Sequence, residues 1–195
     1  MDGPPIYHEK QSQQLCALHT LNNLLQDRQA FTKKDLDHLC VQLSPQNWIN
    51  PHRSILGLGN YDINIIIAAL QTKDCEVQWW DRRKDPSLIT LDNIIGIIVN
   101  VPSNPQFGVV SFPYKRKHWI AVKEINGQFY NLDSKLSRPA VLGNREELLK
   151  FLREKLENKN SEIFVVKPLS RKDIGNLHVR GFCQSLVHVL YLRCC

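Results

Sequence analysis

The sequence predicts an α+β protein, with helices in its first part and antiparallel strands later in the chain. In the first part, apolar residues recur at three- and four-residue steps, which is the spacing of a helix with one buried face. Later, two apolar runs flank Asn126-Gly127, a pair that favours the tight turn of a β-hairpin. The chain has 195 residues, which suits a single domain, and we find no internal repeat.

Three helices are expected first. One covers residues 15–25, and leucines form its buried face. The next begins with Thr32 as its N-cap and ends before Ser44-Pro45. The third is apolar enough to be buried and runs from residue 61 to about residue 72, with Asp62 as its N-cap or first-turn acid.

The middle of the chain is expected to alternate between strands and connections. We expect a strand at residues 76–81, a polar turn at 82–87, a short helix at 90–96 and a second strand at 97–101. Residues 102–113 contain three prolines and are expected to form an ordered loop.

The clearest local signal is the hairpin. Residues 119–125 and 128–132 form its strands, and Asn126-Gly127 suits a type I′ turn between them. After the hairpin, leucines at helical spacing predict an amphipathic helix at 145–158. A last apolar run predicts a buried strand at 163–167.

Three residues at distant positions could form a nucleophilic site. Cys16 falls at the start of the first helix, where the helix dipole and free backbone N–H groups favour the thiolate. His118 immediately precedes one strand of the hairpin and Asp133 immediately follows the other, so the two come out as neighbours at its open end. Asp133 would accept a hydrogen bond from one ring nitrogen of His118, and the other nitrogen would face Cys16.

This order of cysteine, histidine and carboxylate is that of a papain-like triad and indicates a cysteine hydrolase. The oxyanion donors would be the backbone N–H of Cys16 and the side-chain amide of Gln11. The reaction would be acyl transfer through a thioester, with water as the final acceptor.

Each candidate also has a purely structural interpretation. Cys16 could be a small core residue, His118 a hydrogen-bonding group at a strand start, and Asp133 a turn cap. Their joint order and the hairpin geometry favour the triad. His19 shares the helical face of Cys16, but no second Cys/His pair has zinc spacing. We therefore assign His19 a structural role and expect no metal or cofactor.

The composition indicates in which cellular compartment the protein works. No stretch reaches the roughly 20 apolar residues that a membrane-spanning helix needs, and the N-terminus lacks the pattern of a secretory signal. The six cysteines show no regular framework, so we expect them reduced, in the cytosol or the nucleus.

The net charge of +6 includes basic runs at residues 82–84 and 115–117, which could contact nucleic acid or anionic lipid. Because neither run has interleaved aromatic residues, we favour solvated surface and expect no nucleic-acid partner. Trp79-Trp80 adjoins the first run, and strand alternation should send one of its indoles into the core.

Several separated segments share their order with a known family. They are His8-Glu-Lys-Gln11, Leu15-Cys-Ala-Leu-His19, His118-Trp119, Tyr130-Asn-Leu-Asp-Ser134 and Ile163-Phe-Val-Val166. Together they resemble the Josephin family of deubiquitinating cysteine proteases, over a stretch from about Ile6 to Lys167. Asn50-Pro-His-Arg53 and Trp79-Trp-Asp-Arg-Arg83 look like the short Josephin-only members rather than the polyglutamine-bearing ataxin type.

The resemblance implies a papain-like fold, in which N-terminal helices and a helical hairpin arm at residues 31–59 pack on an antiparallel sheet. It also implies cleavage of the isopeptide or peptide bond after the C-terminal glycine of ubiquitin, with ubiquitin and ubiquitinated proteins as partners. Gln11, Cys16 and His118 match the family's oxyanion, nucleophile and base positions. Asp133 stands at the orienting position, where the ataxin type has asparagine.

Two rival functions remain open. One is a ubiquitin-binding adaptor whose catalysis is weak or switched by modification, and the other is a papain-like transferase or amidase with a different substrate. The intact cysteine, histidine and aspartate favour the protease over the adaptor. The chemistry permits the transferase or amidase, and only the family resemblance disfavours it.

The end of the chain departs from the family pattern. We expect a catalytic domain at residues 6–168, working as a monomer, and a divergent tail at 169–195. Residues 182–192 are apolar but too few to span a membrane, and the chain ends in Arg-Cys-Cys. The tail could be a lipidated membrane anchor, because paired terminal cysteines can carry acyl or prenyl groups, or a poorly ordered extension. We favour the second because the domain looks complete without it.

Overall fold

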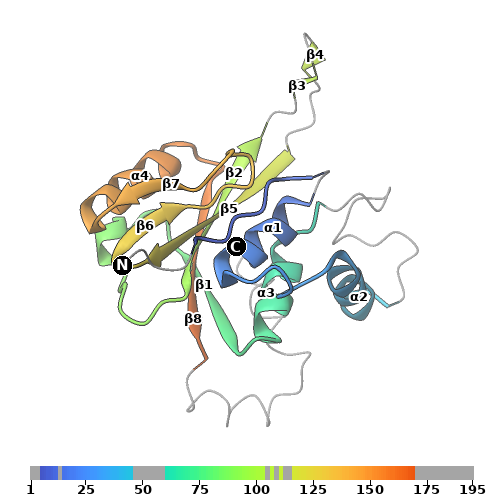
Figure 1. The fold of residues 1–195 in the computed structure, drawn as a ribbon. Coiled ribbons are helices and arrows are strands. Elements are labelled where there is room, and N and C mark those ends of the chain that lie inside the picture. Colours follow the sequence, from blue (N-terminus) through green and yellow to red (C-terminus); the bar gives the residue numbers. More distant parts are fainter. Residues whose placement is uncertain are drawn as a thin grey trace.

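The computed structural model describes residues 5–12, 15–45, 60–103, 106–107, 110–111 and 116–169 (Figure 1). Two expected features lie outside the described residues: the part of the helical arm expected at residues 46–59, and residues 170–195 of the expected tail. Within those ranges, four α-helices and a six-stranded antiparallel sheet confirm the α+β class.

The helical elements are α1 (Cys16–Leu25), α2 (Lys33–Leu43), α3 (Ile63–Gln71), α4 (Arg145–Glu157) and one 3₁₀ turn, η1 (Pro86–Leu88). The strands of the main sheet are β1 (Cys75–Trp80), β2 (Gly96–Ser103), β5 (Arg116–Ile125), β6 (Gln128–Asn131), β7 (Ala140–Gly143) and β8 (Glu162–Pro168). Two short strands, β3 (Gln106–Phe107) and β4 (Val110–Ser111), pair only with each other.

The main sheet has the strand order β1-β8-β2-β5-β6-β7, and every neighbouring pair is antiparallel. β8, the last of these strands in the sequence, lies between β1 and β2 and so pairs along both of its edges. β5 and β6 form the predicted hairpin. At its turn Asn126 and Gly127 have φ values of 53° and 78°, the left-handed conformation that a type I′ turn requires.

Both faces of the sheet are buried, against different helices. Alternate residues of the central strands, such as Ile98 and Phe164, pack with α1 and α3 in a first core. Their neighbours, such as Val99 and Val165, pack with α4 in a second core on the other face (Figure 1). Because side chains on a strand point alternately to the two faces, a strand covered on both sides consists of a continuous apolar run.

Helix starts follow the predicted caps. The Thr32 side chain accepts from the backbone N–H of Asp35, whose carboxylate accepts in return from the backbone N–H of Thr32. Asp62 caps α3 by accepting from the first-turn backbone N–H groups of Asn64 and Ile65. These interactions are local in sequence, and for that reason the caps were predictable.

The expected division of Trp79 and Trp80 is confirmed. Trp80 packs against the second core, whereas Trp79 is 52% exposed on the edge strand β1. The two indoles lie on opposite faces because they are adjacent in one strand.

One predicted element is wrong. No helix forms at residues 90–96. The helical turn in this region is η1, which ends at Leu88, and Asn93 has a left-handed φ of 56° that interrupts any helix. Ile95 donates its backbone N–H to the carbonyl oxygen of Val166 at 2.8 Å, so this stretch already runs alongside β8. Tertiary pairing has overridden a local helical pattern.

Other strands were not anticipated. β7 adds an edge to the sheet beside β6, and β3 with β4 lies inside the segment expected to be loop. β7 is short and its Val141 is 60% exposed, so it lacks the apolar run that marks β2 or β8.

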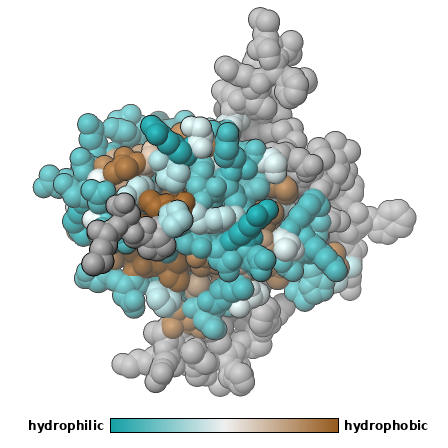
Figure 2. Space-filling model, in the orientation of Figure 1, coloured by the Kyte–Doolittle hydropathy of each residue, from teal (hydrophilic) through white to brown (hydrophobic). Residues whose placement is uncertain are grey.

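Two features describe the surface: its polarity and the contacts of the basic residues Arg82 and Arg83. The described part of the face in Figure 2 is mainly hydrophilic, with smaller apolar patches between. Arg82 has a structural contact, because its guanidinium donates to the carbonyl oxygens of Leu156 and Lys159 at the end of α4. Arg83 pairs with Asp81.

Within the described ranges, none of the helices combines the length and apolarity that crossing a bilayer needs.

Candidate active site

Cys16 is the first residue of α1, as its spacing predicted. The preceding residue, Leu15, provides no side-chain cap, so the helix dipole at this end is not offset by a capping side chain. Cys16 is only 5% exposed and packs in the first core. Its helix lies against β5, the strand that carries His118.

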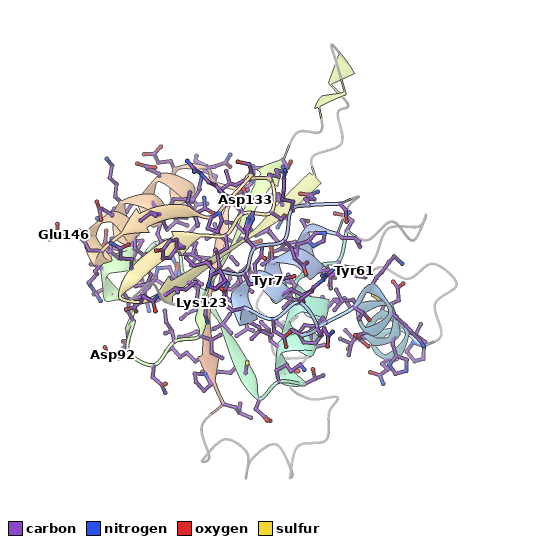
Figure 3. All side chains as sticks on the ribbon, in the orientation of Figure 1. Tyr7, Tyr61, Asp92, Lys123, Asp133 and Glu146 are labelled. Atoms are coloured by element: carbon purple, nitrogen blue, oxygen red, sulfur yellow. The ribbon has the colours of Figure 1, made fainter. Side chains whose placement is uncertain are left out.

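The hairpin brings His118 and Asp133 together. Nε2 of His118 lies 2.6 Å from Oδ1 of Asp133. The pairing of Val122 with Asn131 continues beyond β6, where Leu132 donates its backbone N–H to the carbonyl oxygen of Ala121 at 2.8 Å. The two side chains therefore meet at the open end of the hairpin, as inferred from Asn126-Gly127. The prediction that His118 precedes its strand is wrong: His118 lies within β5, because pairing with Val101 of β2 extends the strand back to Arg116. Figure 3 shows Asp133 near the upper end of the sheet.

Trp119 fixes the strand directly beside His118. Its indole packs on Phe164 with ring centroids 6.0 Å apart, and its Nε1–H donates to the carbonyl oxygen of Tyr61 at 3.0 Å. A large, doubly held neighbour restricts how far the His118 backbone can move. The His-Trp pair therefore serves to orient the imidazole.

The electrostatics favour a charged pair. Burial lowers the pKa of His118, but its hydrogen bonds to Asp133 and Cys16, together with their charges, outweigh burial and leave that pKa raised above the ordinary value. Burial acts on Asp133 in the opposite sense and is again outweighed, mainly by the hydrogen bond from His118, so the pKa of Asp133 is lowered. Since Nε2 serves Asp133, Nδ1 is the ring nitrogen left for Cys16.

Asp133 is itself held in place. The backbone N–H of Lys135 donates to the same Oδ1 that faces His118, at 2.9 Å. The ammonium of Lys135 also reaches Oγ of Ser103, at 2.8 Å, and so ties this loop to the end of β2. The carboxylate thus has a fixed orientation before any substrate binds.

Gln11 lies in an extended segment, residues 5–12, that runs beside α1. Its backbone N–H donates to the carbonyl oxygen of Ser134 at 2.7 Å, which joins the segment to the residue after Asp133. His8 makes a second link, with Nε2 3.0 Å from the carbonyl oxygen of Asp133. The structure thus places the four predicted site residues in one region: Gln11, Cys16, His118 and Asp133.

A buried polar stripe on α1 receives this segment, and the sequence reasoning missed it. Asn23 accepts from the backbone N–H of Glu9 at 2.6 Å and donates to the carbonyl oxygen of Leu132 at 3.0 Å. Gln26 exchanges hydrogen bonds with the backbone N–H and carbonyl of Tyr7. His19, Asn22, Asn23 and Gln26 recur at helical spacing, so the stripe was visible in the sequence as a second, polar face.

Comparisons with known proteins find relatives that match most of the chain. The sequence profile of the Josephin family matches residues 11–167. A Josephin-like protein of Drosophila melanogaster is 48% identical over 162 residues, which cover 83% of this chain and 73% of that protein. Josephin-2 of Mus musculus is 44% identical over 172 residues, 88% of this chain and 91% of that one. Ataxin-3 of Gallus gallus is 24% identical over 168 residues, 83% of this chain and 45% of that one.

Proposed function

Because the chain belongs to the Josephin family, whose α+β fold is papain-like, we propose that it is a deubiquitinating cysteine protease. Its reaction would be hydrolysis of the isopeptide or peptide bond after the C-terminal glycine of ubiquitin. One observation carries the proposal: Nε2 of His118 lies 2.6 Å from Asp133, and Cys16, the first residue of α1, is near enough to the imidazole to help raise the pKa of His118.

In the first half of the reaction, the Cys16 thiolate attacks the carbonyl carbon of the glycine, and the carbonyl electrons move to oxygen. The backbone N–H of Cys16 and the side-chain amide of Gln11 would donate to this oxyanion. When the tetrahedral intermediate collapses, the C–N bond breaks and the leaving amine takes a proton from the His118 imidazolium. A thioester of the ubiquitin C-terminus with Cys16 remains.

In the second half, His118 is neutral and accepts a proton from water as the water attacks the thioester carbonyl. Collapse breaks the C–S bond, releases the ubiquitin carboxylate and restores the thiolate with the imidazolium. Asp133 keeps Nδ1 of His118 directed at the reacting atoms and stabilises the imidazolium in both halves.

The test is ubiquitin bearing a thiol-reactive group at its C-terminus. We expect a covalent adduct on Cys16, identified by peptide mass spectrometry. Cys16→Ala should form no adduct and hydrolyse no conjugate, while still folding and binding ubiquitin, because the change removes one sulfur atom. Cys75→Ala is the matched control. Burial raises the pKa of the Cys75 thiol, so this cysteine should contribute nothing to labelling.

The rival functions give different results in the same experiment. An adaptor would bind ubiquitin without forming the adduct, and a papain-like amidase or transferase with another substrate would neither bind ubiquitin nor react. Cleavage of ubiquitin conjugates by Cys16→Ala would contradict the assignment of the nucleophile.

A further inference from the structure

We propose that Glu9 and His19 are positioning residues, which hold residues 11 and 12 so that the side-chain amide of Gln11 is presented to the oxyanion. The inference rests on the proposed function, since it names how one group of that site is held. It starts from the fact that residues 5–12 are extended but belong to no strand of the sheet. Apart from the packing of Ile6 on the first core, their position depends on individual hydrogen bonds.

Gln11 is fixed on both sides along the backbone. Its own N–H donates to the carbonyl oxygen of Ser134, and the N–H of the next residue, Ser12, donates to Nε2 of His19 at 3.3 Å. The first bond fixes Gln11 to the loop that carries Asp133. The second fixes the next residue to His19 of α1, which lies three residues after Cys16 on the same face of the helix. A rigid helix therefore sets the spacing between the nucleophile and the proposed oxyanion donor.

The ring of His19 can accept from Ser12 in only one tautomer. A backbone N–H is a donor, so Nε2 must be unprotonated and Nδ1 must carry the hydrogen. Nδ1 lies 2.5 Å from Oε2 of Glu9, which accepts that hydrogen. Glu9 thereby selects the tautomer that His19 needs in order to hold Ser12, in the way that a carboxylate orients a metal-bound histidine.

Glu9 is maintained as a carboxylate. Burial raises its pKa, but hydrogen bonds from His19, Tyr7 and Asn22 outweigh burial and leave the pKa lowered. Asn22 is anchored in turn through the backbone of Phe31, whose N–H it accepts at 3.0 Å. The hydrogen bonds that run from Glu9 through His19 to Ser12 are therefore anchored at the Glu9 end by Asn22 and at the other end by the backbone of Ser12.

Stability alone does not explain this arrangement. His19 is 7% exposed, and a buried histidine–carboxylate pair is often no more stabilising than apolar residues of the same volume. The pair does provide a fixed direction, and catalysis by hydrogen bonding to an oxyanion depends on the direction of the donor.

The experiment is a double-mutant cycle between His19 and Gln11, with kcat measured on a fluorogenic ubiquitin C-terminal amide. Gln11→Ala should lower kcat by about 10²–10³-fold. His19→Leu should lower kcat by about 10- to 100-fold, because a misplaced donor is almost as costly as a missing one. In the Gln11→Ala background, His19→Leu should change kcat by no more than about twofold, since there is no longer an amide to position.

Two further variants separate positioning from folding. His19→Gln should recover most of the activity, because its amide oxygen can accept from the N–H of Ser12. Glu9→Gln keeps the side-chain volume, so it should fold even if His19→Leu were to unfold. Like His19→Leu, it should lower kcat only when Gln11 is present. Thr20→Val is the matched control, because Thr20 is buried on the same helix and its hydroxyl has no hydrogen-bond partner among the described residues. Its kcat should equal that of the parent.

The outcomes are distinct. A full loss from His19→Leu or Glu9→Gln in the Gln11→Ala background would show that the pair supports the fold, and would overturn the inference. Parent-like kcat in His19→Leu, or in Gln11→Ala, would overturn it as well. In both cases the Cys16 adduct would still form, whereas failure of the proposed function would abolish the adduct in the parent protein.

Discussion

One oxygen atom of Asp133 connects the candidate triad to the rest of the molecule. Oδ1 accepts from Nε2 of His118 at 2.6 Å and from the backbone N–H of Lys135 at 2.9 Å. An amide oxygen can accept both bonds but has no full charge. Asparagine at this position would therefore remove only the charge, whereas alanine would remove both the charge and the acceptor. The geometry and the charge of the residue can therefore be tested separately.

Asp133→Ala removes both the acceptor and the charge, and we expect kcat to fall by about 10²-fold or more. Asp133→Asn keeps an acceptor for both donors, so the loss should be smaller. The measurement is kcat on the fluorogenic ubiquitin amide, with thermal unfolding to verify folding. If Asp133→Ala had the kcat of the parent, Asp133 would have only a structural role and the site would reduce to a Cys16–His118 dyad.

The charge of Asp133 should also set the pH dependence. Asp133 raises the pKa of His118, so the imidazolium persists to higher pH in the parent than in Asp133→Asn. In the variant, the alkaline limb of kcat/KM should move to lower pH. The acidic limb should move to higher pH, because a weaker imidazolium supports the thiolate less. Measuring kcat/KM across pH reports both limbs for the free enzyme.

Glu146→Gln is the matched control for this profile. It removes one carboxylate charge from an exposed position on α4, well separated from Asp133 (Figure 3). Its profile should superimpose on that of the parent. A shift of the same size in both variants would mean that overall charge, and not the contact with His118, moves the profile.

Among the elements, α1 combines two buried faces. Its leucines and Cys16 pack in the first core, while the polar stripe from His19 to Gln26 holds the segment 5–12 and the loop that leads to Asp133. A helix with one buried face tolerates rotation about its axis better than a helix that is specified on two sides. The second face therefore determines where the sulfur of Cys16 lies.

Close approach of α1 to the sheet depends on Gly96. A Cβ added there would lie 2.6 Å from Cδ1 of Leu24 and 2.6 Å from the backbone carbonyl oxygen of Val122. We expect Gly96→Ala to lower the free energy of unfolding by about 1–3 kcal/mol, because the backbone oxygen cannot rotate away. Chemical denaturation of the two proteins measures the difference.

Gly127→Ala is the comparison, since a Cβ at Gly127 would meet no atom within 4 Å and only its φ of 78° is unfavourable. That strain amounts to about 1–2 kcal/mol. If Gly96→Ala had the free energy of unfolding of the parent, α1 would not be in tight contact with the sheet at this position.

At the scale of the molecule, β8 joins the two halves of the sheet. It pairs with β1 on one edge and β2 on the other, and its side chains enter both cores. The next residue, Leu169, still donates its backbone N–H to the carbonyl oxygen of Asp74 at 2.7 Å. We therefore propose that the folded domain ends at Leu169, one residue beyond the expected boundary at residue 168.

A chain ended after Leu169 should remain folded and active on ubiquitin substrates. A chain ended after Ser161 lacks β8 and should not fold. β1 and β2 would both lose their pairing with β8, and both cores would open. Circular dichroism and activity compare the two. Unfolding of the longer chain would show that residues 170–195 are needed for folding, and the proposed boundary would be wrong.

The sequence by itself determined the features that arise from neighbouring residues. Asn126-Gly127 sets the register of the hairpin, and this register brings Asp133 to the end of the hairpin that carries His118. Thr32 and Asp62 cap their helices through bonds that span only a few residues. The alternation at Trp79 and Trp80 follows from strand geometry.

Only the tertiary structure decided the features that depend on contacts between distant parts of the chain. Ile95 pairs with Val166, and this pairing replaced the expected helix at residues 90–96. β8 takes its place in the middle of the sheet through partners far away in the sequence. The segment that carries Gln11 has no regular structure of its own, so its path is set by the side chains of α1 and the backbone at Ser134. Local patterns cannot encode such choices, because their free energy appears only when the distant surfaces meet.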